Sequence, residues 1–150
     1  MKINENTYNH IITKCSNNPG ETRGIIGGKN NIISAFEFDK GMAESKQHYF
    51  PDIEKLNTCI ENWQNENIKF YGIVHSHFRE EKELSFGDTK YIHIIMEAMP
   101  KNIRFLYFPI VLPQKELVSF KALWVKNEIN IINDDIKIIN EGGLKREKSN

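Results

Sequence analysis

Apolar residues recur at intervals of three and four along parts of the chain, which predicts three amphipathic helices. We expect these helices at about 8–15, 53–63 and 86–99. Pro51 suits the first turn of the second helix, and Pro100 ends the third. The apolar positions that set the spacing are Tyr8, Ile11, Ile12 and Cys15, then Ile53, Leu56, Ile60 and Trp63, then Ile92, Ile95 and Met96.

Between these helices, runs of β-branched and aromatic residues predict strands. The glycine pair at 27–28 is expected to close the first strand, and Pro109 suggests an edge or a bulge in a later one. The segment 129–139 alternates around a turn signal at 133–135 and is expected to form a hairpin. The other expected strands are 21–28, 32–38, 69–77, 103–112 and 117–125.

This order of elements predicts an α+β fold, close to α/β, in which helices flank a mixed sheet. A chain of 150 residues fits one domain, which we expect to span residues 1–140. The segment 141–150 is charged after a glycine pair, so we expect a disordered tail.

Composition bears on the class of function. Apolar residues make up 39% of the chain and charged residues 27%, and the formal net charge is zero, so no basic excess favours nucleic acid as a partner. The amino terminus is polar and no apolar run approaches the length of a membrane span, so we expect a cytoplasmic protein without a membrane partner. Cys15 and Cys59 are expected to be free thiols in a reducing compartment, with Cys59 packed in the core.

Two histidines, His75 and His77, close the strand expected at 69–77. Residues i and i+2 of a strand point to the same face, so both imidazoles leave the sheet in one direction. The following loop can return the carboxylate of Asp88 beside them. Two imidazoles and a carboxylate with one open position describe a catalytic zinc site. His93, inside the third helix, is expected to be structural rather than a ligand.

Ser85 and Asp88 also form the pattern of a helix-capping box, which needs no function by itself. The two roles are compatible, because a serine can cap a helix and also donate to the oxyanion of a hydrolytic reaction. Hydrolysis further needs a carboxylate base away from the metal, and the residues alone do not choose one among the glutamates. The same ligand set also occurs in non-haem iron oxygenases, which keeps a second enzyme class open.

These residues resemble the motif of the JAMM metalloproteases, the family also called MPN-domain proteins. The family pattern is a glutamate on an early strand, then H-x-H, seven residues and S-x-x-D. Here it reads Glu21-Thr22-Arg23-Gly24, then His75-Ser76-His77, then Ser85 and Asp88. The resemblance covers about residues 4–125, and stand-alone bacterial members have a similar length. It implies the MPN/JAMM (cytidine deaminase-like) fold, a mixed curved β-sheet flanked by helices.

The resemblance implies a role for each motif residue. His75, His77 and Asp88 would bind Zn²⁺, Glu21 would be the general base and proton shuttle, and Ser85 would steady the oxyanion. The implied activity is that of a deubiquitinase-like isopeptidase or peptidase, which cleaves after the C-terminal glycines of a ubiquitin-like protein. Implied partners are that protein or its conjugate and enzymes similar to ubiquitin-activating (E1) and conjugating (E2) enzymes, as in bacterial antiviral (anti-phage) defence. Processing of a sulfur-carrier protein and a metal-free scaffold are the family's alternatives.

Two positions depart from the family pattern. Phe78 stands where proline is frequent, and Arg23 stands where glycine is frequent; neither is a ligand, and both bear on substrate specificity. The segments 40–50 and 78–84 are the expected substrate contacts. Gly142-Gly143 resembles the end of the family's substrates, so self-processing is a further hypothesis.

Overall fold

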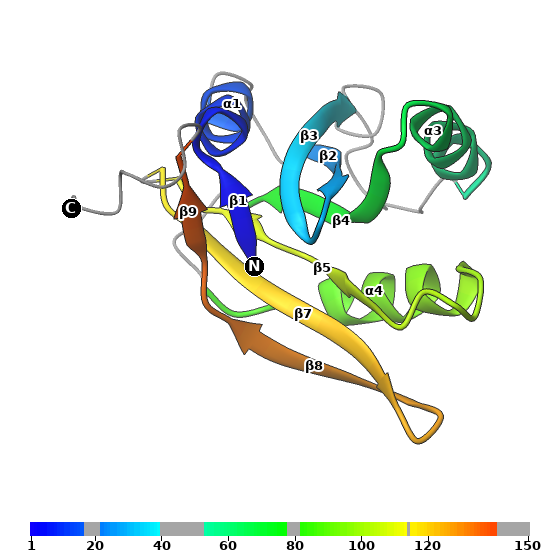
Figure 1. Ribbon diagram of the computed structural model, residues 1–150. Helices are drawn as coiled ribbons and strands as arrows, with labels where there is room; N and C mark the ends of the chain where they lie inside the picture. The colour runs from blue at the N-terminus through cyan, green and yellow to red at the C-terminus, as the bar shows by residue number, and fades with distance from the viewer. Residues whose placement is uncertain (17–21, 40–52, 78–81, 114, 141–150) are drawn as a thin grey trace.

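The computed structural model describes residues 1–16, 22–39, 53–77, 82–113 and 115–140. They form one mixed sheet with helices packed on both faces (Figure 1). In chain order the elements are β1 (Lys2–Asn4), α1 (Glu5–Ser16), β2 (Arg23–Lys29), β3 (Ile32–Asp39), α3 (Ile53–Asn65), β4 (Lys69–Ser76), α4 (Phe86–Ala98), β5 (Phe105–Tyr107), β6 (Ile110–Val111), β7 (Leu117–Val125), β8 (Glu128–Asp134) and β9 (Lys137–Ile139).

Strand β4 lies near the middle of the sheet. It pairs antiparallel with β2 on one side and parallel with β5 and β6 on the other. Across the sheet the order is β8, β7, β5 with β6, β4, β2, β3, β1 and β9. Strands β8 and β9 are thus at opposite ends of this order, yet only Asp135 and Ile136 connect them. A connection this short spans at most about 10 Å, so the sheet must curve until its two ends approach each other.

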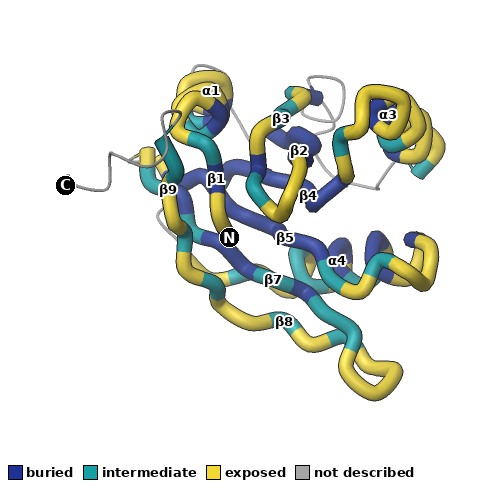
Figure 2. The backbone as a smooth tube through the Cα atoms, in the orientation of Figure 1, coloured by how far each residue is buried: buried dark blue, intermediate teal, exposed yellow. Residues whose placement is uncertain are grey.

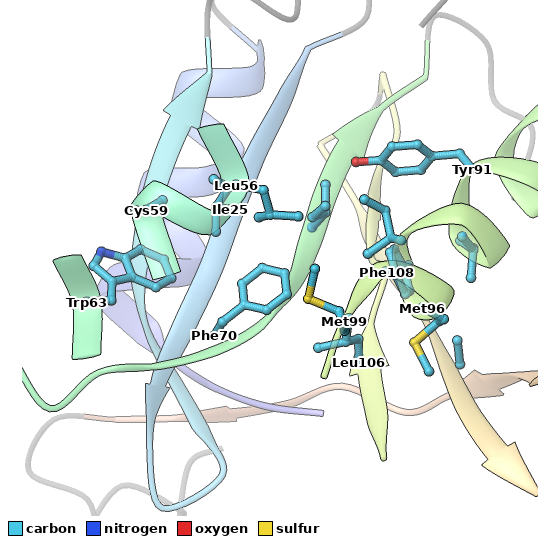
Figure 3. Close-up of a cluster of buried hydrophobic side chains, with 14 residues drawn as sticks. Ile25, Leu56, Cys59, Trp63, Phe70, Tyr91, Met96, Met99, Leu106 and Phe108 are labelled. Atoms are coloured by element: carbon cyan, nitrogen blue, oxygen red, sulfur yellow. The ribbon is translucent and has the colours of Figure 1, made fainter. Parts of the chain in front are cut away.

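Helix α1 covers one face of the sheet, and α3 and α4 cover the other (Figure 1). Two main apolar clusters match these layers. One contains Leu56, Cys59 and Trp63 of α3 with residues of α4 and the sheet (Figure 3). The other joins Ile11 and Cys15 of α1 to the opposite face. Because both faces are covered, β2 and β4 are buried along most of their length (Figure 2). This burial explains why β4 reads as a nearly continuous apolar run.

All three expected helices are present, and each buries the stripe that its apolar spacing indicates. Both thiols are free and buried, as expected from the sequence. Pro51, expected in the first turn of α3, lies outside the described residues, as do Phe78, the segment 141–150 and most of the two expected substrate-contact segments. No helix among the described residues is long and apolar enough to cross a membrane.

Two expectations about strands are wrong, and tight turns explain both. Strand β2 does not close at Gly27 and Gly28 but continues to Lys29, with register shifts at the glycines. The turn into β3 is made by Asn30 and Asn31, both with positive φ. Likewise, the segment 129–139 is not a hairpin. Its first part is β8, which pairs with β7 across Lys126 and Asn127, again both at positive φ. Two successive residues at positive φ make the turn that suits the twist of a two-residue hairpin.

The second half of the wrongly expected hairpin is β9, and β9 pairs with a strand that the sequence pattern did not reveal. Strand β1 is three residues long and lies between β3 and β9, parallel to both. A polar three-residue strand carries almost no periodic signal. The sequence pattern therefore does not predict β1.

The expected strand 103–112 is present in two parts, β5 and β6, and Pro109 lies at the break as anticipated. The carbonyl of Pro109 accepts the amide of His75, and the carbonyl of Val111 accepts the amide of His77 (3.1 and 3.0 Å). Gly72 has φ of +152° and faces the backbone of Tyr107 so closely that a Cβ would collide with it. These contacts fix the end of β4, where the candidate site lies.

Candidate metal centre

His75 and His77 leave β4 on the same side, towards α4. His75 pairs with Ile110 and with Arg23, so it lies between two neighbouring strands, and its side chain is almost completely buried. His77 follows the last residue of the strand and is partly buried. The ring centroids are 4.9 Å apart, and the two Nε2 atoms are 3.1 Å apart. The strand geometry thus directs one nitrogen of each ring to a common point.

Asp88 reaches the same point from the first turn of α4. Ser85 caps this helix: its hydroxyl accepts the amide of Asp88 (3.0 Å), and its amide donates to Oδ2 of Asp88 (2.9 Å). The capping box expected from the sequence is therefore present. It holds the Asp88 carboxylate at the end of the helix that faces the histidines.

The three side chains converge at hydrogen-bonding distance. Oδ1 of Asp88 lies 3.2 Å from Nε2 of His75, and Oδ2 lies 3.2 Å from Nε2 of His77. In a tetrahedral zinc site, metal–ligand bonds of about 2.0–2.1 Å place neighbouring ligand atoms about 3.3 Å apart. The observed separations of 3.1–3.2 Å match that value. The group His75, His77 and Asp88 therefore fits Zn²⁺ in both donor type and spacing.

The protonation states also suit a metal. Burial is the main cause that lowers the pKa of His75 to about 4, and it outweighs the hydrogen bond that His75 donates to Asp88. The positive charge of Arg23 adds to the lowering. Burial alone would raise the pKa of Asp88. Hydrogen bonds from His75, His77 and the Ser85 amide outweigh it and hold that pKa well below its usual range. At neutral pH the site therefore offers a neutral imidazole at His75 and an ionised carboxylate, the forms that bind metals.

Glu21, the predicted general base, lies outside the described residues, but its neighbour Thr22 does not. Thr22 is fully buried and makes three contacts with Ser76, the residue between the two histidines. Its amide donates to the Ser76 hydroxyl (2.8 Å), its carbonyl accepts the Ser76 amide (3.0 Å), and the two hydroxyls are 3.0 Å apart. The chain immediately after Glu21 is therefore bonded to β4 between His75 and His77.

Arg23 occupies a position that the sequence linked only to specificity. Its side chain is 8% exposed, and its guanidinium lies over the ring of Tyr91 from α4, 5.1 Å from the ring centroid. Arg23 and His75 are directly opposite in the β2–β4 ladder, so their side chains share a face of the sheet. A permanent positive charge is thus packed beside the candidate metal ligand His75. An arginine within an apolar strand was the signal in the sequence that could have revealed this contact.

The remaining expected site residues are placed as follows. Ser85 is exposed at the end of α4, and its hydroxyl, which accepts the Asp88 amide, retains a proton to donate. His93 lies further along α4 and is not part of the metal-type group found among the described residues. Gly142 and Gly143 lie outside the described residues.

Known proteins resemble this chain in fold rather than in sequence. No protein-family model matches the chain, and no curated protein matches its sequence. Solved structures do resemble it. Protein DSY2949 from Desulfitobacterium hafniense is 16% identical with a TM-score of 0.65, and the match covers 93% of each chain.

Two further solved structures carry the name of a fold. AF2198, a JAB1/MPN domain protein from Archaeoglobus fulgidus, is 17% identical with a TM-score of 0.54, and the match covers 92% of this chain and 98% of AF2198. A structure described as a JAMM metalloprotease-like zinc site in the proteasome and signalosome is 17% identical with a TM-score of 0.53, and the match covers 93% and 97%. The chain therefore has the MPN/JAMM fold, a mixed curved sheet flanked by helices.

Proposed function

We propose that this protein is a zinc-dependent hydrolase that cleaves peptide or isopeptide bonds. The observation that carries the proposal is the convergence of His75, His77 and Asp88 within hydrogen-bonding distance at the end of β4. The MPN/JAMM fold supports it, because the same fold is found in a structure described as a JAMM metalloprotease-like zinc site.

His75, His77 and Asp88 would hold the ion. Zinc bound in this way lowers the pKa of a coordinated water towards neutrality and polarises a carbonyl. The chain supplies the other groups. Ser85 stands at the same helix end as Asp88, and its hydroxyl proton can be donated to the developing oxyanion. Glu21 is the proposed base, and the bonding of Thr22 to Ser76 supports its placement near the histidines.

The proposed substrate is a ubiquitin-like protein, cleaved after its C-terminus either from a conjugate or from a precursor. The support is the resemblance of Glu21, His75-Ser76-His77, Ser85 and Asp88 to the JAMM motif. Enzymes similar to E1 and E2 would then act in the same pathway, and an antiviral conjugation system in the cytoplasm is the proposed setting.

The direct test is cleavage of a ubiquitin-like protein fused through its C-terminus to a reporter. Cleavage by the purified protein should stop with a chelator and return with zinc. It should be lost in His77→Ala and Glu21→Gln but kept in His93→Ala, a histidine outside the metal-type group. Cleavage that survives Glu21→Gln and His77→Ala would refute the proposal, and so would a protein that purifies with iron and turns over only with oxygen.

A further inference from the structure

A surface pocket lies on the same face of the sheet as the candidate metal centre. It has a volume of about 210 Å³ and lies between the end of β3 and helix α3. Ile25 and Cys59, both buried, belong to its lining. The other residues around it are Glu37, Phe38, Asp39, Lys55, Thr58 and Asn62.

The strand register relates this pocket to the metal ligands. Asp39 is directly opposite Arg23 on β2, and Arg23 is directly opposite His75 on β4. Directly opposite residues in antiparallel pairs point to the same face, so Asp39, Arg23 and His75 form one row across three strands. Two strand spacings of about 4.8 Å separate the ends of that row by about 10 Å. Arg23 therefore lies between Asp39, at the pocket, and His75, at the candidate metal centre.

The pocket contains one ion pair and one further acidic side chain. The buried carboxylate of Asp39 is paired with Nζ of Lys55 at 2.8 Å, so these two charges offset each other. The exposed carboxylate of Glu37 accepts a hydrogen bond from the Cys59 thiol (3.7 Å). Burial raises the pKa of that thiol to about 12, with the Glu37 charge adding to the effect. The pocket therefore has one acidic side chain, Glu37, besides the Asp39–Lys55 pair.

We propose that this pocket is a specificity subsite for a lysine or arginine side chain of a polypeptide substrate, about three residues from the bond cleaved at the metal centre. The apolar stem of such a side chain packs on Ile25 and Cys59 while its cation meets Glu37, a division that suits long basic side chains. The separation follows from the geometry, because about 10 Å of extended chain contains about three residues. The assignment rests on the proposed hydrolase function for its link to cleavage.

Binding can be tested without cleavage. N-acetyl-arginine amide, titrated into isotope-labelled protein, should shift the amide signals of Ile25, Thr58 and Cys59, and N-acetyl-glutamine amide should not. Glu37→Gln should remove the arginine response. Glu54→Gln, an exposed acidic position in the first turn of α3 outside the pocket, is the matched control and should keep it. No shift in the wild type, or equal shifts with the glutamine amide, overturns the assignment.

The link to the metal centre is tested with the reporter fusion, varied to arginine, glutamate or alanine at the third residue on either side of the cleaved bond. Arginine on one side should raise kcat/KM by about three- to tenfold over glutamate, and Glu37→Lys should reverse the preference. Glu54→Lys should leave it unchanged. Zinc-dependent cleavage with no charge preference overturns this inference alone. A wild type that cleaves nothing, with or without zinc, overturns the proposed function and the cleavage link together.

Discussion

The amide of Thr22 donates a 2.8 Å hydrogen bond to the hydroxyl of Ser76, and both residues are buried. Ser76 points to the face of β4 opposite to that of His75 and His77, since side chains alternate along a strand. One contact therefore joins the start of β2 to the strand that carries the histidines, from behind the site.

Removal of this hydrogen bond should weaken the attachment of the start of β2 to β4. Ser76→Ala leaves the buried Thr22 amide without this acceptor and should lower the free energy of unfolding by about 1–3 kcal/mol. Urea denaturation of the metal-free protein measures the loss. Ser34→Ala, at an exposed position on β3, is the control and should change little. Equal stability of the two variants would show that the Ser76 hydroxyl contributes nothing.

The metal-free protein should lose stability in mild acid. The pKa of His75 in the folded protein is about 4, below the value of about 6.5 in the unfolded chain, so the unfolded state binds more protons between these values. Stability is therefore complete above about pH 6.5 and falls as the pH approaches 4, by up to about 3 kcal/mol. The depressed pKa of Asp88 acts in the same direction at lower pH.

Urea midpoints measured with a chelator at pH 7.5, 5.5 and 4.5 would record this fall. His75→Gln removes the titrating group and should flatten the profile between pH 6.5 and 4.5. A wild type whose midpoint is constant over that range would contradict the burial of a neutral His75.

Gly72 and Gly87 should respond in opposite ways to alanine. A Cβ at Gly72 would collide with the backbone of Tyr107, and φ of +152° is unfavourable for alanine, so Gly72→Ala should destabilise by more than about 4 kcal/mol. At Gly87 the nearest heavy atom to a Cβ is 3.8 Å away, and the residue is helical. Gly87→Ala should therefore be neutral or stabilising by up to about 1 kcal/mol. Thermal melting of the pair tests this, and a folded, stable Gly72→Ala would be the contrary result.

Asp88 and Ser85 share one cap but should differ in metal binding. Each loses one bond of the capping box when replaced by alanine, which should cost about 0.5–2 kcal/mol of stability without metal. Asp88→Ala also loses the contacts with His75 and His77, so its loss should be the larger one. In zinc titrations only Asp88→Ala should lose high affinity. If Ser85→Ala lost it as well, the helix cap rather than the carboxylate would determine the site.

Local patterns predicted the parts of this fold that local physics determines. The apolar stripe of α3, the capping box of α4 and the interruption at Pro109 all depend on neighbouring residues, and all are present. The spacing of His75, His77 and Asp88 singled out three side chains that the structure brings together. Their role as ligands, and the roles of Glu21 and Ser85, stay predictions.

The sequence failed where partners are distant. The alternation in segment 129–139 resembles that of a hairpin. Instead, β8 pairs with β7 across a two-residue turn, and β9 pairs with β1, which is distant in sequence. Arg23 was recognised as unusual, yet its contact with Tyr91 depends on how α4 packs on the sheet. The pocket beside α3 arises in the same way, from two elements that no local pattern connects.

The pairing of β1 with β9 has a consequence for synthesis. Among the described strands, Lys2–Asn4 is made first and its partner Lys137–Ile139 is made last. The segments that bring His75, His77 and Asp88 together, including Pro109 and Val111, are complete earlier. A nascent chain made as far as Val111 therefore contains the residues that bring His75, His77 and Asp88 together, and β1 can already pair with β3, whereas the side of β1 that β9 occupies still lacks its partner. The β1–β9 pairing therefore has to wait until the last described strand has been made, after every segment around His75, His77 and Asp88.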